Sequence, residues 1–199
     1  MELFILKKRF FLYGMNKMKE KACFLDRDGT LNVEIKNLHE PEKVKLEKNV
    51  PEALKLLKNN GFKLIVITNQ AGIARGVFEE KDIAAVHNKI QELLKEHGVQ
   101  IDKFYYCPHH PKFSGECECR KPKTALFAQA VEEFDIDIRQ SFMIGDRITD
   151  IQAGEDAFCK KTYLVKTGYG IETIFENSDY SFNVAEDILD AAQKIVNQQ

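Results

Sequence analysis

Residues 62–76 read FKLIVITNQAGIARG, a mostly apolar run that passes directly into a polar loop containing two glycines. A short apolar run of this kind is typical of a strand that is buried on both faces of a parallel sheet. In open α/β sheets, ligands bind beyond the carboxyl ends of the strands, where such loops lie. The stretch therefore predicts an α/β protein with a ligand site just after residue 67.

The segments on either side repeat the same alternation of strand and helix. Apolar residues recur at helical spacing within 50–57 and within 83–94, and a glycine follows each segment, which predicts a helix on each side of the strand. Repetition of this pattern predicts a Rossmann-like three-layer α/β fold with a central parallel sheet. The expected strands are 22–25, 62–67, 103–106, 141–144 and 162–165, and the further helices are 124–134 and 185–196, with a turn at 168–170.

Length, composition and charge exclude several classes of protein. The chain has 199 residues, of which 44% are hydrophobic, enough for one core without disulfides. We expect a single domain over 19–199, preceded by an extension, 1–18, of unclear role. No apolar run approaches the ~20 residues of a membrane span, and no signal peptide is recognisable, which favours the cytoplasm. The net charge of −2 lacks the basic excess of a nucleic-acid-binding surface.

Carboxylates follow two of the predicted strands. Asp26 and Asp28 stand directly after the first strand, and Asp146 follows the strand at 141–144. Parallel strands bring their carboxyl ends to one edge of the sheet, so these groups should meet. Mg²⁺ is usually held by one or two carboxylates together with a substrate phosphate, and it would relieve their repulsion. We expect a Mg²⁺ site, with one carboxylate of the Asp26–Asp28 pair acting as nucleophile and the other carrying a proton.

Donors suited to a phosphoryl group follow two further strands. Thr68 and Asn69 offer hydroxyl, amide and backbone groups, and Lys121 offers a positive charge. Taken singly, a pair of aspartates or a Thr-Asn step is more often an ordinary turn. Their order, with a compatible group after each of four strands, favours phosphoryl transfer through an aspartyl-phosphate intermediate.

Residues 107–119 contain a pattern of metal ligands. Cys107, His109, Cys117 and Cys119 form C-x-H-x7-C-x-C, and three thiolates with one imidazole suit tetrahedral Zn²⁺. Four protein ligands leave no position for a water molecule, so we expect a structural zinc that holds the loop leading to Lys121. The spacing does not decide between His109 and His110. The alternative is that Cys107 merely ends a buried strand and that the other thiols bind nothing.

Four segments resemble, in order, the motifs of the haloacid dehalogenase-like phosphatases. Within that superfamily the chain resembles the group of histidinol-phosphate and heptose bisphosphate phosphatases, which lack a separate cap domain and carry a zinc loop. The resemblance implies the same fold, a Mg²⁺-dependent phosphatase activity and His109 as the zinc ligand. The segments are FLDRDGTLN (24–32), VITNQAGIARG (66–76), CRKP (119–122) and MIGDRITD (143–150).

The resemblance also implies a role for each motif residue. Asp26 would be the nucleophile and Asp28 the general acid and base. Mg²⁺ would be held by Asp26, Asp146 and the backbone carbonyl of Asp28, with Asp150 supporting the metal site. Thr68 and Lys121 would stabilise the transferring phosphoryl group.

The choice of substrate rests on two segments that resemble the heptose enzymes more than their histidinol-phosphate relatives, IARG at 73–76 and CPHHP at 107–111. We therefore expect hydrolysis of the 7-phosphate of D-glycero-D-manno-heptose 1,7-bisphosphate. Because no cap domain is evident, we also expect a monomer that selects small substrates by short loops. Asn69 and Gln70 would bind the substrate, and Arg120 and Arg147 its second phosphate. The alternatives are a histidinol-phosphate phosphatase, a zinc-stabilised binding module without turnover, and a nucleic-acid end phosphatase, which the net charge disfavours.

Overall fold

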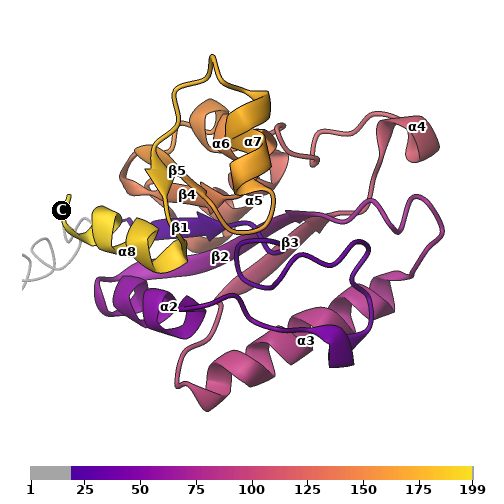
Figure 1. Ribbon diagram of the computed structural model, residues 1–199, viewed down its shortest axis with the longest axis horizontal. Coiled ribbons are helices and arrows are strands. Elements are labelled where there is room, and N and C mark those ends of the chain that lie inside the picture. The colour runs from indigo at the N-terminus through magenta and orange to yellow at the C-terminus, as the bar shows by residue number, and fades with distance from the viewer. Residues whose placement is uncertain (1–18, 199) are drawn as a thin grey trace, which may run out of the picture.

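The strand side chains alternate between two buried faces, which explains why the sheet lies between two layers of helices (Figure 1). In β1 (Lys21–Leu25), Cys23 packs into one apolar cluster and Phe24 into the other. β2 (Phe62–Asn69) alternates in the same way. Parallel strands with helices on both sides need two apolar faces of this kind. The expectation that residues 62–67 form a strand buried on both faces is confirmed.

The structure, a computed structural model, describes residues 19–198, and the predicted extension 1–18 lies outside this range. Six strands in the described range form one parallel sheet in the order β3-β2-β1-β4-β5-β6. The chain runs outward from β1 through β2 to β3, and then continues on the other side of β1. The connections after β1 and β4 therefore lead in opposite directions, which opens a cleft beyond the carboxyl ends of these two strands. The further strands are β3 (Lys103–Cys107), β4 (Phe142–Gly145), β5 (Lys161–Val165) and β6 (Val184–Ala185).

The helices cover both faces of this sheet (Figure 1). α2 (Val50–Asn59), α3 (Glu80–Glu96) and α8 (Ile188–Val196) pack on one face, and α5 (Ala125–Phe134) and α6 (Ile148–Asp156) on the other. This arrangement confirms the predicted Rossmann-like three-layer fold. No helix between residues 19 and 198 is long and apolar enough to cross a membrane. The shorter helices are η1 (Pro41–Lys43), α4 (Pro111–Ser114), η2 (Ile138–Gln140) and α7 (Gly170–Glu176).

The C-terminal part differs from the expectation at several points. The helix expected at 185–196 begins only at Ile188, because the Asp187 side chain accepts hydrogen bonds from the next backbone N–H groups and caps the helix there. Ala185 instead belongs to the short strand β6. The sequence pattern does not predict α6 or α7, since helices of nine and seven residues span too few turns to show a clear apolar period.

Candidate active site

Three buried carboxylates meet beyond the carboxyl ends of the two central strands. Asp26 follows β1, Asp146 follows β4, and Asp150 lies in the first turn of α6. One oxygen atom of each lies within 4.8 Å of the others, and no residue of the three is more than 6% exposed. Carboxylate oxygens gathered in this way suit a hard divalent cation. The pairing of β1 with β4 thus brings the predicted Asp26 and Asp146 together and adds Asp150 to them.

Lys121 lies against the same carboxylates. Its Nζ is 2.6 Å from Asp26 Oδ1 and 2.7 Å from Asp150 Oδ1, and it donates a hydrogen bond to the carbonyl of Ile67. The Asn69 side chain holds the Lys121 backbone through two hydrogen bonds, one from Nδ2 to the carbonyl and one accepted by Oδ1 from the N–H. The end of β2 therefore fixes the position of a cation that arrives on another loop. Asn69, predicted to bind substrate, makes these contacts to the chain itself.

Two glycines enclose the Asp146 carboxylate. Gly29 and Gly168 have positive φ angles of 76° and 54°, and a Cβ atom on either would lie 2.3 Å from Asp146 Oδ2. The Tyr169 backbone N–H donates to the same oxygen at 2.8 Å. Oδ1 is buried and accepts no hydrogen bond from any described residue, and a buried acceptor of this kind fits the coordination of a cation. Gly168 and Tyr169, which lie in the turn predicted at 168–170, therefore form part of the site.

Asp28 has a cation of its own. Arg27 Nη2 lies 2.7 Å from Asp28 Oδ2, and Asn32 and Gln70 also donate to the carboxylate. Burial raises the pKa of Asp28, but the charge of Arg27 and these hydrogen bonds outweigh it and hold the pKa below its ordinary value. From the sequence, a bound cation is expected to relieve the repulsion between Asp26 and Asp28. In the structure Lys121 and Arg27 already neutralise them separately, and the carboxylate that joins the cluster is Asp150 rather than Asp28.

The remaining carboxylates repel one another. Burial raises the pKa of Asp26 from 3.8 to about 7, although Lys121 opposes the rise. Burial likewise raises the pKa of Asp146 to about 8, and the negative charges of Asp26 and Asp150 add to it. A cation bound among these groups favours their ionised forms and lowers both values.

This electrostatic strain predicts that stability falls with rising pH when no Mg²⁺ is added. A carboxyl whose pKa is raised on folding stabilises the fold fully below pH 3.8, and that contribution disappears as the pH passes through about 7 for Asp26 and about 8 for Asp146. We expect the free energy of unfolding, measured in urea, to fall by roughly 1–3 kcal/mol between about pH 6.5 and about pH 8.5.

Two controls accompany this measurement. Asp146→Asn should weaken the pH dependence, and Mg²⁺ should restore stability most at the higher pH. His87 acts in the opposite sense, since burial lowers its pKa from 6.5 to about 3. Its contribution to the pH dependence of stability is confined to pH values below 6.5, outside the measured window. Stability that stays constant or rises across the window would contradict the prediction.

A cavity of about 710 Å³ opens beside the carboxylates, within the usual size range of small-ligand sites. Arg120 and Arg147, both predicted to bind a second phosphate, line it. The guanidinium of Arg147 lies 3.8 Å from the centre of the Tyr169 ring, and Arg120 Nη1 donates to the carbonyl of His109 at 3.2 Å. Two held guanidinium groups on the wall suit an anionic ligand.

The predicted Gln70 also lines the cavity, but its amide is engaged. Its Nε2 donates to Asp28 Oδ2 and to Thr68 Oγ1, each at 2.9 Å. Sequence reasoning missed further lining residues, among them Tyr169 and Arg75. The only sequence feature that could have indicated Arg75 is its place in the motif at 73–76. For Tyr169, that feature is the neighbouring Gly168, which indicates a turn.

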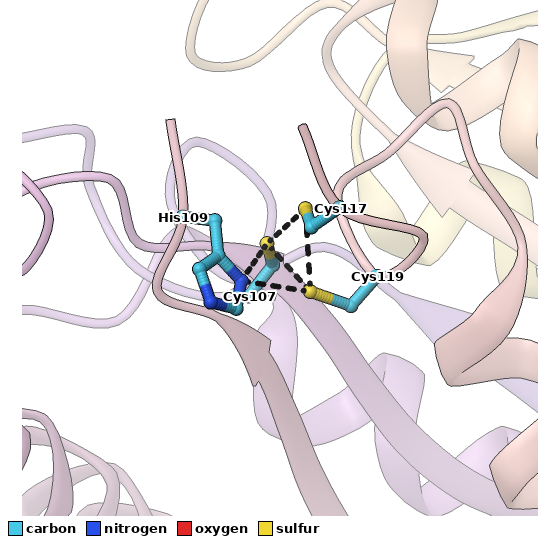
Figure 2. Close-up of side chains that lie close together, drawn as sticks. All are labelled: Cys107, His109, Cys117 and Cys119. Atoms are coloured by element: carbon cyan, nitrogen blue, oxygen red, sulfur yellow. Dashed lines mark hydrogen bonds between the residues drawn. The ribbon is translucent and has the colours of Figure 1, made fainter. Parts of the chain in front are cut away.

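The predicted zinc ligands come together at the end of β3, as Figure 2 shows. Cys117 Sγ lies 3.6 Å from Cys107 Sγ and 3.6 Å from Cys119 Sγ. The Sγ atoms of Cys107 and Cys119 are 2.9 Å apart, and His109 Nδ1 is 3.3 Å from Cys119 Sγ. A tetrahedral zinc with bonds of about 2.3 Å separates sulfur atoms by about 3.8 Å, close to the longer separations. His110 lies outside the cluster, and its Nδ1 accepts a hydrogen bond from the backbone of Lys112.

Known proteins resemble the chain in both sequence and fold. Residues 21–189 match the family described as Polynucleotide kinase 3 phosphatase. D-glycero-beta-D-manno-heptose-1,7-bisphosphate 7-phosphatase of Pasteurella multocida is 45% identical over 153 residues, 75% of this chain and 83% of that protein. The chain belongs to the heptose bisphosphate phosphatases of the haloacid dehalogenase-like superfamily.

Heptose bisphosphate phosphatases named for either anomer resemble the chain. D-glycero-alpha-D-manno-heptose-1,7-bisphosphate 7-phosphatase of Photorhabdus laumondii is 39% identical, over 85% of this chain and 96% of that protein. The crystal structure of D,D-heptose 1.7-bisphosphate phosphatase from B. bronchiseptica, complexed with magnesium and phosphate, matches with a TM-score of 0.82 at 29% identity, covering 90% of this chain and 99% of that chain. The resemblance stated from the four motifs is confirmed.

Proposed function

We propose that this chain is a Mg²⁺-dependent phosphatase that removes the 7-phosphate of D-glycero-D-manno-heptose 1,7-bisphosphate through an aspartyl-phosphate intermediate. The observation that carries the proposal is the convergence of Asp26, Asp146, Asp150 and Lys121 in one buried cluster beside the cavity. The substrate is the one for which the similar heptose bisphosphate phosphatases are named.

The chain's own carboxylates would carry both chemical steps. In the first, an oxygen of Asp26 forms a bond to phosphorus and the bond from phosphorus to the sugar oxygen breaks. The negative charge of the bound phosphates raises the pKa of Asp28, so that Asp28 carries a proton and donates it to the departing oxygen. In the second, Asp28 takes a proton from water as the water oxygen attacks phosphorus. Inorganic phosphate leaves, and the Asp26 carboxylate is restored.

The other residues of the site would stabilise charge. Asp26, Asp146 and the backbone carbonyl of Asp28 would hold Mg²⁺, with Asp150 supporting them. Bound there, Mg²⁺ supplies positive charge that offsets the repulsion between phosphate and carboxylates. Lys121 adds a fixed positive charge, and the Thr68 hydroxyl can donate to a phosphoryl oxygen.

The second phosphate would lie at the arginines of the cavity wall. Arg147 lies over the Tyr169 ring, so less side-chain freedom is lost when it binds an anion. Arg120 is tied to the backbone of the cysteine and histidine loop. Asn69 and Gln70 both line the cavity and would bind the substrate there, and Asn69 also fixes the position of Lys121.

The test is a comparison of substrates under one set of conditions. Phosphate release should be measured from both anomers of the heptose bisphosphate, from histidinol phosphate and from an oligonucleotide with a 3′-phosphate. We expect one or both heptose anomers to have the highest kcat/KM. Preference for histidinol phosphate would overturn the substrate assignment, and preference for the oligonucleotide would favour a nucleic-acid end phosphatase. No turnover of any substrate would favour a binding module.

The chain is further proposed to act as a monomer in the cytoplasm.

We also propose that Cys107, His109, Cys117 and Cys119 bind a structural Zn²⁺. The proposal is supported by the closeness of their ligand atoms and by the loop they anchor, which leads directly to Arg120 and Lys121. Four protein ligands close the shell, so the ion would hold the loop and take no part in the reaction.

Metal analysis tests this assignment. The purified protein should contain about one zinc per chain. Cys119→Ser should lose most of the zinc, lower the melting temperature and reduce turnover by a smaller factor than loss of the nucleophile, because Asp26 remains. Cys159→Ser is the matched control, since Cys159 lies outside the cluster and should leave the zinc content unchanged. Zinc-free wild-type protein would refute the proposal.

A further inference from the structure

Arg27 lies between Asp26 and Asp28 in the sequence, and its side chain forms an ion pair with Asp28. Its Nε and Nη2 donate to Asp28 Oδ1 at 3.1 and 2.9 Å, and Nη2 also donates to Oδ2 at 2.7 Å. The Arg27 side chain is completely buried, and it is not among the described residues that line the cavity. The Asp28 side chain is 18% exposed and does line it. Arg27 therefore holds Asp28 from behind and has no direct access to a ligand in the cavity.

Two neutral side chains also donate hydrogen bonds to the Asp28 carboxylate. Asn32 Nδ2 donates to Asp28 Oδ1 at 3.0 Å, and Gln70 Nε2 donates to Oδ2 at 2.9 Å. Both carboxylate oxygens are thus held by donors from two separate loops. Contacts of this kind restrict rotation about both side-chain torsions of Asp28, and the guanidinium fork sets the plane of the carboxylate.

A purely structural account explains the burial of Arg27 poorly. Burying a guanidinium costs free energy, and an apolar side chain of similar size often replaces a buried ion pair without loss of stability. Here the cost is increased because Arg27 Nη1 is buried and has no hydrogen-bond partner within residues 19–198. Within residues 19–198, the hydrogen bonds that the buried guanidinium donates all go to the side chain of Asp28.

We propose that Arg27 is a positioning residue that orients Asp28 for proton transfer to the departing sugar oxygen. The inference rests on the proposed function, in which Asp28 is the general acid. Such a transfer requires the donor and acceptor atoms to come within about 3 Å, and displacement of a reacting group by about 1 Å can cost roughly 10²-fold in rate. Arg27 supplies this precision through the Asp28 carboxylate that it binds, and it does not line the cavity in which the substrate would lie.

The readout is the dependence on the leaving group. The sugar oxygen of the heptose substrate needs a proton as it departs, whereas p-nitrophenolate leaves as a stable anion. Because kcat/KM reports the steps up to departure of the leaving group, a misplaced acid lowers kcat/KM for the heptose bisphosphate much more than for p-nitrophenyl phosphate. Loss of general fold integrity would lower both values together.

The experiment compares the wild type with R27K, R27Q, D28N and H87F. R27K keeps the charge without the fork, and we expect its kcat/KM to fall ~10–100-fold on the heptose bisphosphate and by less than about 3-fold on p-nitrophenyl phosphate. R27Q should show the same selective loss, and D28N a larger one. H87F is the control for altered packing of a buried side chain, because His87 is buried in α3 and stacks on Phe104 with ring centres 4.4 Å apart. It should leave the ratio of the two kcat/KM values unchanged.

The outcomes separate the two levels of the proposal. If D28N shows no dependence on the leaving group, the role of Asp28 in the proposed function is wrong. If D28N shows it while R27K and R27Q lose both activities equally, or neither, the positioning role of Arg27 is wrong. Circular dichroism and urea unfolding of each variant are measured in parallel. If neither Arg27 variant folds, Arg27 is a structural residue and the inference is overturned.

Discussion

Asp26→Asn is expected to abolish phosphate release, with a fall in kcat on the order of 10⁴-fold or more. The amide that replaces the carboxylate has no anionic oxygen that can attack phosphorus. The substitution also removes one negative charge from the groups that would hold Mg²⁺. Release of phosphate from the heptose bisphosphate measures the effect. The side chain keeps its shape, so the fold should persist.

The variant should also gain stability when no Mg²⁺ is present. Asp26 is buried with Asp146 and Asp150, and one uncharged group in this cluster relieves their mutual repulsion, while Lys121 keeps its ion pair with Asp150. A melting temperature equal to or above that of the wild type, together with lost activity, is the expected combination. Asp179→Asn, in the turn after α7, is the control and should change neither quantity. Activity retained by Asp26→Asn would support the binding module instead.

Lys121→Met is expected to lower kcat by about 10²–10³-fold, the effect of removing one fixed group that stabilises charge in the transition state. Lys121 is 3% exposed, and its ammonium is shared between Asp26 and Asp150. Without it, the two carboxylates face Asp146 with no protein cation between them. Breaking a buried ion pair typically costs about 3–5 kcal/mol, so urea unfolding without Mg²⁺ should show a large loss of stability.

Lys58→Met provides the matched comparison for this variant. Lys58 also pairs with an aspartate, at 2.5 Å from Asp102, but its side chain is 39% exposed. Exposed pairs contribute about 0–1 kcal/mol, so this variant should keep its activity and nearly all of its stability. Added Mg²⁺ should rescue the stability of Lys121→Met in part and have no such effect on Lys58→Met. If Lys121→Met retained more than about a tenth of the wild-type kcat, its proposed role in charge stabilisation would be wrong.

Much of the fold was predictable because local patterns specify it. The strand at 62–67 is apolar on both faces, and the structure confirms it as part of β2. The short elements were not predictable in the same way. β6 has two residues, and it exists because Val165 and Ala185 pair across the sheet edge. Pairing of this kind depends on the positions of distant segments and leaves no periodic trace in the sequence.

The candidate site shows the same division at the level of single residues. Asp26, Asp28, Lys121 and Asp146 stand out because each follows a strand within a recognisable motif. Their ion pairs were not predictable, since Lys121 pairs with a residue 95 positions away. The role of Gly168 was also hidden, because its need for a positive φ angle arises only where the backbone passes the Asp146 carboxylate.

The amino-acid sequence alone determined which chemical groups are available. These are the motif carboxylates, Lys121, and three thiols with one imidazole at the spacing of a metal site. These follow from residue types placed at the ends of locally specified strands. The tertiary structure decided which charges neutralise one another, with Lys121 between Asp26 and Asp150, and Arg27 behind Asp28. The reason is physical: burial and pairing energies depend on distances of a few ångströms, and only the packing of strands β1 and β4 side by side sets those distances.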